Sequence, residues 1–144
     1  MGERLVFTLI NTEDQEYLPV QATGLSAGFD LRARLDHDVV LKSGERVLIP
    51  VGVALSKEFL IDQFVAVCSR SGLAINHGVY VLNAPGIIDA DYVGHEVKVI
   101  LANCGSTDMV ITDKMRIAQA LILKHAGGYN LDSGIRLGGF GSTG

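Results

Sequence analysis

Five short segments of the sequence combine glycine with charged, amide or hydroxyl side chains in a way that packing a hydrophobic core does not require. They occupy residues 26–31 (SAGFDL), 69–74 (SRSGLA), 83–94 (NAPGIIDADYVG), 116–119 (RIAQ) and 136–144 (RLGGFGSTG). Guanidinium groups and backbone amides at helix starts bind phosphate, and a well-placed carboxylate takes a proton from an attacking water. These residue types indicate a site for a small phosphate-bearing ligand.

The segment around Arg70 begins where an apolar run, residues 64–68, ends. Ser71 is suited to cap a short helix over residues 72–76, which Gly78 would end. N–H groups at the start of that helix, beside the Arg70 guanidinium, would make a cradle for phosphate. An ordinary helix cap with a surface arginine explains the same residues equally well.

Residues 83–92 predict a hairpin whose tip, Ala84-Pro85-Gly86, is tightly constrained. A rigid backbone edge offers N–H and C=O groups that can pair with a flat base. Asp89 at the foot of the hairpin is the candidate for holding and deprotonating a water. Asp91 would share its strand face if the strand were regular, and we assign Asp91 to structure. Tyr92, taken alone, is equally an ordinary strand aromatic.

Two polar residues stand in glycine-rich or apolar surroundings. Gln119 interrupts the apolar run 117–123, where a polar side chain needs a hydrogen-bond partner. A core glutamine bonded to backbone would satisfy that need. Asp30 follows Ala27-Gly28-Phe29, and for this residue alone a capping role is the simpler explanation.

The elements that must position these residues are predicted to be short β-strands. Apolar residues alternate over residues 47–55 and 97–101, while residues 64–68 and 117–123 are apolar on both faces, as in strands buried between sheets. Glycine- and aspartate-rich breaks at 42–45, 103–106 and 112–114 separate the runs. The pattern predicts an all-β, single-domain, jelly-roll-like distorted β-barrel with one short helix.

The last segment has a different composition from the rest of the chain. Residues 127–144 are rich in glycine and cannot pack a core, so we divide the chain into a β-barrel core over 1–126 and a C-terminal arm over 127–144. Composition favours a disordered tail. An arm that becomes ordered over a bound ligand is the alternative.

Composition excludes several classes of protein. The chain has 144 residues, 48% hydrophobic, with a formal net charge of −4 and no basic cluster, so long nucleic acid is not an expected partner. No apolar run is long enough to cross a bilayer and the N-terminus lacks the layout of a secretory signal, so we expect a soluble cytoplasmic protein without a membrane partner. The two cysteines, Cys68 and Cys104, favour buried thiols over a disulfide, and the scattered histidines do not suggest zinc.

Taken together, in this order and spacing, the five segments resemble the five motifs of the trimeric deoxyuridine triphosphate nucleotidohydrolases (dUTPases). The resemblance covers the chain from Ser26 to Gly144. It implies a Mg²⁺-dependent homotrimer that hydrolyses dUTP to dUMP and pyrophosphate. Such an enzyme keeps uracil out of DNA and supplies dUMP for thymidylate synthesis.

The resemblance also implies roles for individual residues. Asp89 would be the general base for attack on the α-phosphorus, Asp30 would reach Mg²⁺ through a water, and Gln119 would face the phosphates and the attacking water. Arg116 would be structural, in an ion pair. The substrate-binding residues that it implies are Arg70, Ser71 and Gly72 for the triphosphate, Asn83, Gly86, Ile87 and Ile88 for uracil, Tyr92 for deoxyribose, and Arg136, Phe140, Gly141, Ser142 and Thr143 in the arm.

The chain departs from the family pattern at four places. Ser69 stands where proline is frequent, Val93 stands where arginine is frequent, and His95 stands where an acidic or other polar residue is frequent. The arm has only Leu137 between Arg136 and the Gly-Gly-Phe-Gly sequence, one residue fewer than usual. Either Ile135 occupies the place of the family arginine, or the arm is one residue shorter. A glycine-rich arm is able to adjust so that Arg136 still reaches the γ-phosphate.

In the family, three subunits share each active site. One would give the segments of Asp30, Arg70 and Gln119, a second the hairpin with Asp89 and Tyr92, and a third the arm. Two alternatives stay open: a dCTP deaminase or bifunctional homologue on the same fold, and a catalytically idle binding protein. Leu73-Ala74 after Gly72 argues against the deaminase, and Asp89 argues against the idle protein.

Overall fold

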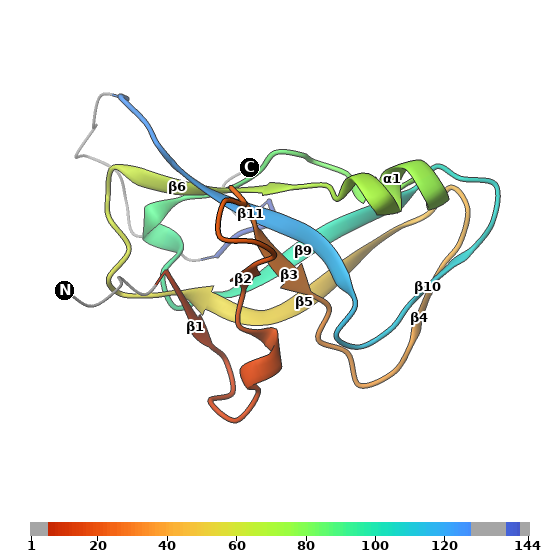
Figure 1. The fold of residues 1–144 in the computed structure, drawn as a ribbon, viewed down its shortest axis with the longest axis horizontal. Coiled ribbons are helices and arrows are strands. Elements are labelled where there is room, and N and C mark those ends of the chain that lie inside the picture. Colours follow the sequence, from red (N-terminus) through yellow and green to blue (C-terminus); the bar gives the residue numbers. More distant parts are fainter. Residues whose placement is uncertain (1–5, 128–137, 142–144) are drawn as a thin grey trace.

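The computed structural model describes residues 6–127 and 138–141, and it consists mainly of β-strands. One α-helix and two 3-10 helices interrupt the strands (Figure 1). In chain order the elements are β1 (Phe7–Leu9), η1 (Gln15–Tyr17), β2 (Val20–Gln21), β3 (Phe29–Arg32), β4 (Val39–Leu41), β5 (Arg46–Leu55), β6 (Gln63–Cys68), α1 (Ser71–His77), β7 (Val79–Val81), β8 (Gly86–Ile88), η2 (Ala90–Tyr92), β9 (Glu96–Asn103), β10 (Met109–Ile111) and β11 (Arg116–Lys124).

The strands form three sheets, and neighbouring strands in each are antiparallel. One sheet has the order β1-β5-β9-β7, the second has the order β2-β3-β11-β6-β8, and β4 pairs with β10 in a small third sheet. The β4–β10 pair forms one end of the molecule, on the right in Figure 1. The predicted all-β architecture with one short helix is confirmed.

The core lies between the two larger sheets. In β5 the alternating residues Ile49, Val51 and Val53 are each at most 1% exposed. In β9 the alternating residues Val97, Val99 and Leu101 are also at most 1% exposed. Strands β6 and β11 pair with each other in the middle of their sheet, and consecutive residues are buried at 65–67 in β6 and at 117–118 in β11. The predicted alternation is confirmed, and burial on both faces is confirmed for these consecutive residues. Leu123 of β11, by contrast, is 43% exposed.

The helix begins one residue earlier than predicted. Arg70, rather than Ser71, is the N-cap, since its carbonyl accepts the first helical bond from the Ala74 amide at 3.1 Å. Its side chain makes no capping bond, because a guanidinium has no acceptor atom. Ser71 is thus the first residue inside the helix. Gly78 ends it, as predicted, with a left-handed φ of 66° that favours glycine.

The predicted hairpin over residues 83–92 is wrong in its pairing. β7 pairs with β9 in one sheet, whereas β8 pairs with β6 in the other, so the turn through Asn83 and Pro85 crosses between sheets. The regular strand assumed for Asp89 and Asp91 is also wrong. Asp89 caps η2, and Asp91 lies within it. Pairing with β6 and β9 provides more buried contacts than the two short strands could make with each other.

The described residues Cys68 and Cys104 are both free thiols. Cys68 is half-buried, and burial raises the pKa of its thiol. Cys104 is exposed, which corrects the expectation of two buried thiols. It follows the last residue of β9, where the chain turns at the surface. Within the described part of the chain, no helix is long and apolar enough to cross a membrane.

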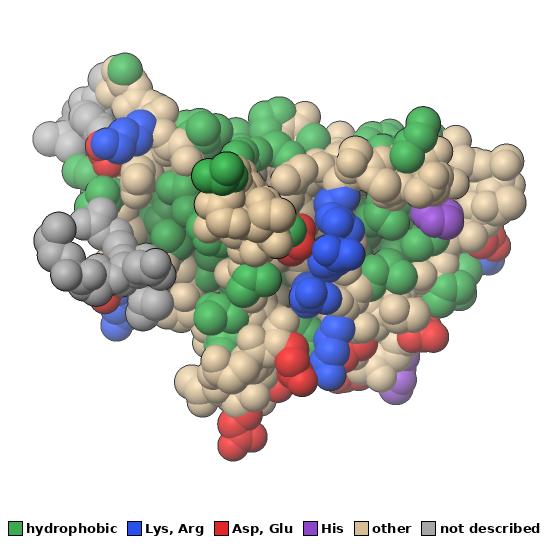
Figure 2. Space-filling view, in the orientation of Figure 1, with side chains coloured by type: hydrophobic (Ala, Val, Ile, Leu, Met, Phe, Trp, Pro, Cys, Tyr) green, Lys and Arg blue, Asp and Glu red, His purple; other side chains and the backbone are tan. Residues whose placement is uncertain are grey.

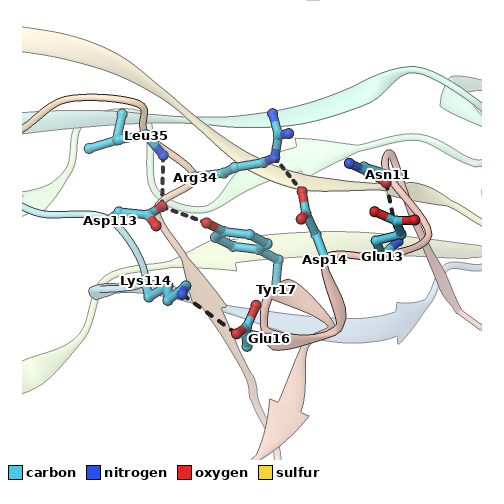
Figure 3. Close-up of polar contacts among 9 residues, drawn as sticks. All are labelled: Asn11, Glu13, Asp14, Glu16, Tyr17, Arg34, Leu35, Asp113 and Lys114. Carbon is cyan, nitrogen blue, oxygen red and sulfur yellow. Dashed lines mark hydrogen bonds and ion pairs between the residues drawn. The ribbon is translucent and has the colours of Figure 1, made fainter.

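Hydrogen bonds and ion pairs connect the N-terminal segment around Asp14 and Tyr17 with Arg34 and Asp113 of the barrel (Figure 3). The Tyr17 hydroxyl donates to Asp113 Oδ1 at 2.6 Å, and the same oxygen accepts the Leu35 amide at 2.9 Å. Arg34 Nε donates to Asp14 Oδ2 at 3.0 Å. Because Gly52 has no side chain, Tyr17 and Arg34 can approach β5 here: a Cβ on Gly52 would lie 2.9 Å from Arg34 Cδ.

This network shifts two pKa values in opposite directions. Burial, the hydrogen bond to Asp113 and the charge of that carboxylate raise the pKa of Tyr17 from 10.0 to about 12. At Asp113, burial acts to raise the pKa, but the hydrogen bonds from Tyr17 and the Leu35 amide, together with the charge and the amide of Lys114, outweigh it, and the net pKa is lowered. The folded protein therefore favours a neutral Tyr17 beside an ionised Asp113.

Replacing Tyr17 with phenylalanine should lower the free energy of unfolding at neutral pH by about 1–2 kcal/mol, because one hydrogen bond to a charged group is lost. A raised pKa in the folded state contributes stability below pH 10 that is lost between pH 10 and about 12. Urea unfolding of both proteins across this range should show a stability difference that shrinks as pH rises. A difference that is constant with pH would contradict the coupling.

Candidate active site

A small slot of about 120 Å³ opens beside strand β8. The residues that line it include Asn83, Gly86, Ile88, Asp89, Tyr92 and Phe140. Its floor is apolar and comes from β6, β7 and β9 through residues such as Val67, Val81 and Val99. A flat ring that enters this slot would meet apolar surface below and backbone along one side.

Strand β8 is the last strand of its sheet. Among the described residues, it pairs with β6 on one side and has no strand on the other, so its second edge offers backbone N–H and C=O groups. Gly86 is buried at the start of this edge, and a Cβ there would lie 3.4 Å from both Asn83 Nδ2 and Val67 Cβ. Glycine therefore keeps the backbone close to Asn83. An unpaired strand edge can recognise a ligand as it would a neighbouring strand.

Asp89 lies where β8 ends and η2 begins, at the mouth of the slot. Its backbone carbonyl accepts the Tyr92 amide at 3.0 Å, so the backbone of Asp89 starts the 3-10 turn. The residue is exposed to solvent. Asp89 is thus a carboxylate that water can reach, in the lining of a slot that also contains Asn83 and Lys98.

Tyr92 forms one wall of the slot and is 9% exposed. Its hydroxyl donates to the Glu96 carbonyl at 3.0 Å. Tyr92 belongs to η2, which corrects the expectation of a strand aromatic.

A second group of predicted residues meets at the end of β6. In the sheet register Gln119 of β11 lies opposite Asp30 of β3 on one side and Cys68 of β6 on the other. Gln119 Nε2 donates to the Ser69 carbonyl at 3.0 Å, which satisfies the amide as expected for a core glutamine. A Cβ on Gly28 would collide with Gln119 Oε1, so the glycine of this segment leaves room for the amide.

Asp30 is the charged centre of this second group. Its side chain is 13% exposed. Asp30 Oδ1 lies 3.6 Å from Arg70 Nε, and Asp30 Oδ2 lies 3.6 Å from Arg116 Nη1. The ion pair expected for Arg116 is therefore confirmed. Two guanidiniums beside one carboxylate leave an excess of positive charge, and Figure 2 shows a column of Lys and Arg side chains on this face. Such a group is suited to bind an anion.

The structure does not bring all of the predicted residues together in one chain. Asp30, Arg70 and Gln119 meet in the second group, and none of them lines the slot that contains Asn83, Asp89 and Tyr92. Ser71 and Gly72 lie exposed in the first turn of α1, next to Arg70. The predicted site is thus divided into a slot and an arginine cluster.

The described part of the arm, residues 138–141, reaches the slot. Gly139 and Phe140 are among its lining residues, and Phe140 is half exposed with a left-handed φ of 54°. Left-handed φ values are uncommon for non-glycine residues and mark positions of functional interest. Gly141 follows with a φ of 97°. The predicted residues Arg136, Ser142 and Thr143 lie outside the described residues.

Asp30 is suited to bind Mg²⁺ only together with water and substrate phosphates. Within residues 6–127 and 138–141, no group of three His, Cys, Asp or Glu side chains is placed to hold a metal. Mg²⁺ keeps several waters and commonly binds one or two carboxylates together with substrate phosphates. Asp30 matches that pattern as a single carboxylate beside a candidate phosphate site, and it does not match a metal cage built by protein alone.

Three contacts were not predicted from the sequence. Ser69 Oγ accepts the Val81 amide at 2.9 Å and joins the end of β6 to β7. Arg70 Nη1 donates to the Arg116 carbonyl at 3.4 Å. The ring of His95 stacks on Tyr92 with centroids 5.0 Å apart. Glycine at position 94 signals a turn before His95, but the sequence carries no signal for the stacking.

The fold and these two groups define a class of protein: a distorted β-barrel with a small slot at a sheet edge and an arginine cluster at a helix start. The family model for dUTPase matches residues 14–144. Among curated proteins, the deoxyuridine 5'-triphosphate nucleotidohydrolase of Rickettsia felis is 48% identical over 134 residues, 88% of each chain, and that of Rickettsia akari is 46% identical over 133 residues, also 88% of each.

Solved structures agree on the fold. A crystal structure of dUTPase from Streptococcus mutans superposes with a TM-score of 0.76 at 23% identity, covering 87% of this chain and 99% of that one. The dUTPase of EIAV superposes with a TM-score of 0.70 at 24% identity, covering 88% and 93%. The chain belongs to the dUTPase family, and the resemblance carried by its five motifs is confirmed.

Proposed function

We propose that this chain hydrolyses dUTP to dUMP and pyrophosphate, with a water activated by Asp89 attacking the α-phosphorus in line. The observation that carries the proposal is the position of Asp89, a solvent-accessible carboxylate at the mouth of a slot built from a strand edge. Membership of the dUTPase family and the names of relatives at 46–48% identity support the choice of substrate. Such an enzyme limits uracil in DNA and supplies dUMP for thymidylate synthesis, in the cytoplasm.

Uracil would bind along the open edge of β8. Backbone groups of Gly86, Ile87 and Ile88, with the Asn83 amide beside them, would pair with the oxygens and the N3–H of the base. Cytosine presents a donor where uracil presents an acceptor, and a site built on hydrogen bonds rejects such a mismatch by ~10⁴ or more. The methyl group of thymine would collide with the strand edge. Phe140 of the arm would stack on the exposed face of the base.

Tyr92 would select deoxyribose. A ring that is 9% exposed and bonded at its hydroxyl to the Glu96 carbonyl has little freedom to withdraw from the slot. A sugar packed against that ring would have no room for a 2′-hydroxyl. The Asp89 carboxylate, at the same mouth, would contact the 3′-hydroxyl as well as the attacking water.

The arginine cluster would bind the triphosphate. Arg70, with Ser71 and Gly72 in the first turn of α1, would hold the phosphate oxygens, while Gln119 would face the phosphates and the attacking water. Asp30 would reach Mg²⁺ through a water. The metal, when bound, neutralises phosphate charge and holds the α-phosphoryl group in a reactive geometry. We further propose that Arg136, Gly141, Ser142 and Thr143 contact the γ-phosphate.

A homotrimer would unite the slot and the cluster. Because the two groups are separate within one chain, a complete site requires the cluster of one subunit to face the slot of another. Residues 1–126 would form the barrel core of each subunit, and residues 127–144 the arm, supplied by a third. In this chain Gly139 of the arm packs on the ring of Tyr92. Because every subunit has the same slot, an arm that binds to a neighbouring subunit would make the same contact with the Tyr92 of that subunit.

The decisive experiment compares dUTP, dCTP, dTTP and UTP, each with Mg²⁺ and with the metal chelated. We expect pyrophosphate release from dUTP only, and loss of that activity on chelation. Ammonia release from dCTP would identify a deaminase or a bifunctional enzyme instead. Binding of dUTP without hydrolysis would identify an idle binding protein, and equal cleavage of dUTP and UTP would refute the role of Tyr92.

A further inference from the structure

Tyr92 is held at several points besides its packing in the slot. Its amide donates to the Asp89 carbonyl at 3.0 Å, and its hydroxyl donates to the Glu96 carbonyl at 3.0 Å. One face of its ring is covered by the imidazole of His95, with centroids 5.0 Å apart and an interplanar angle of 28°. The backbone and the hydroxyl therefore fix the two ends of the side chain, and His95 supports the ring between them.

A tight turn places His95 on that ring. The His95 amide donates to the Tyr92 carbonyl at 3.3 Å, and Gly94 between them has a left-handed φ of 83° that favours glycine. The Gly94 amide donates to the Leu55 carbonyl at 3.3 Å, and Val93 forms a bridge with Leu55 of β5. Because the turn is tied to a buried strand, the imidazole is held over Tyr92 by the core.

The same ring also meets the arm. A Cβ added to Gly139 would lie 2.9 Å from Cε2 and 3.4 Å from Cζ of Tyr92, so the arm backbone packs directly on the tyrosine. Any displacement of the ring would alter both the wall of the slot and the surface that receives the arm. The position of Tyr92 therefore matters to two parts of the site.

We propose that His95 is a positioning residue for Tyr92, and that its stacking sets how strictly the site discriminates deoxyribose from ribose. The proposal rests on the proposed function, in which Tyr92 excludes the 2′-hydroxyl. A steric wall discriminates only as far as it resists displacement. Removing the imidazole leaves the ring held at its hydroxyl and backbone but unsupported on one face, so a ribose can push it aside.

The test measures kcat and KM for dUTP and for UTP in wild type, His95→Ala and His95→Phe. In His95→Ala the ratio of kcat/KM for dUTP to that for UTP should fall by about three- to tenfold, mainly because UTP improves, as expected for the loss of one aromatic pair. In His95→Phe, which restores a flat ring, the ratio should return to within about twofold of wild type. An unchanged ratio in His95→Ala would overturn the proposal.

His125→Ala is the matched control. His125 also contacts an aromatic ring, that of Phe64, with centroids 6.1 Å apart, at a place that does not line the slot. Its removal should leave the ratio unchanged. A fall equal to that in His95→Ala would show that loss of any such imidazole has this effect, and would overturn the proposal.

A second measurement separates this inference from the proposed function. The chain has four tyrosines and no tryptophan, so its near-ultraviolet circular dichroism reports mainly on tyrosine packing. Loss of the stack should reduce the tyrosine signal in His95→Ala, and His95→Phe should recover it. An unchanged spectrum would overturn the positioning role. If the wild-type protein failed to hydrolyse dUTP while His95→Ala still lost the tyrosine signal and His95→Phe recovered it, only the proposed function would be refuted.

Discussion

Replacing Asp89 with asparagine should reduce the turnover of dUTP by about 10²–10⁴-fold, the contribution that a general base usually makes. Asparagine has nearly the same shape and is an equally good N-cap, so η2 should persist. The bond that starts this 3-10 helix runs from the Tyr92 amide to the backbone carbonyl of Asp89, which the substitution keeps. The substitution removes the negative charge and, with it, the ability to accept a proton from water.

Pyrophosphate release gives the turnover of this variant, and calorimetric titration with a non-hydrolysable dUTP analogue gives its affinity. Affinity should stay within about threefold of wild type, because the carboxylate acts on the water more than on the bound nucleotide. Asp91→Asn is the matched control: it changes an exposed carboxylate two residues away, within η2, and should leave turnover near the wild-type value. Normal turnover in Asp89→Asn would refute the assignment of the general base.

Deleting residues 136–144 should lower kcat/KM for dUTP by about 10²-fold or more while leaving the fold intact. The deletion removes Arg136, the residues proposed for the γ-phosphate, and Phe140 over the slot. Poorer positioning of a substrate alone can cost 10²-fold, and an arginine that stabilises phosphoryl charge can contribute more. The buried hydrophobic core extends from Phe7 to Ala120, so the melting temperature should change by only a degree or two.

Calorimetry and steady-state kinetics on the truncated protein separate the two effects. Phe140→Ala in the full-length chain tests the stacking role without shortening the arm. It should raise KM for dUTP, since Phe140 lines the slot and is half exposed. Unchanged kinetics after the deletion would mean that the segment is a tail without a role in the site. A large loss of stability would instead assign the arm to the barrel.

Local sequence patterns were sufficient to predict the four longest strands and the α-helix of this protein. Period-two apolarity identified β5 and β9, continuous apolarity identified β6 and β11, and glycine marked the end of α1 at Gly78. These predictions succeed because side-chain alternation and left-handed turns are properties of a few consecutive residues. For the same reason, the five motifs were recognisable from their residues and spacing.

Such local patterns do not predict which strands pair with each other. The constrained Ala84-Pro85-Gly86 turn indicated a hairpin, yet β7 and β8 enter different sheets. The exposure of Cys104 was beyond such patterns as well, because the burial of a side chain depends on the rest of the fold. Partner choice is decided by the total apolar area that the whole barrel buries, and no short window of sequence contains that quantity.

The residue types of the site, and therefore its chemistry, can be read from the chain: a carboxylate for water, guanidiniums for phosphate, and a backbone edge for a base. Their grouping cannot. Asp30, Arg70 and Gln119 meet because β3, β11 and β6 are neighbours, while Asp89 and Tyr92 lie at a separate slot at the edge of β8. Distances between residues far apart in sequence arise from long-range packing, and that packing also sets His95 against Tyr92.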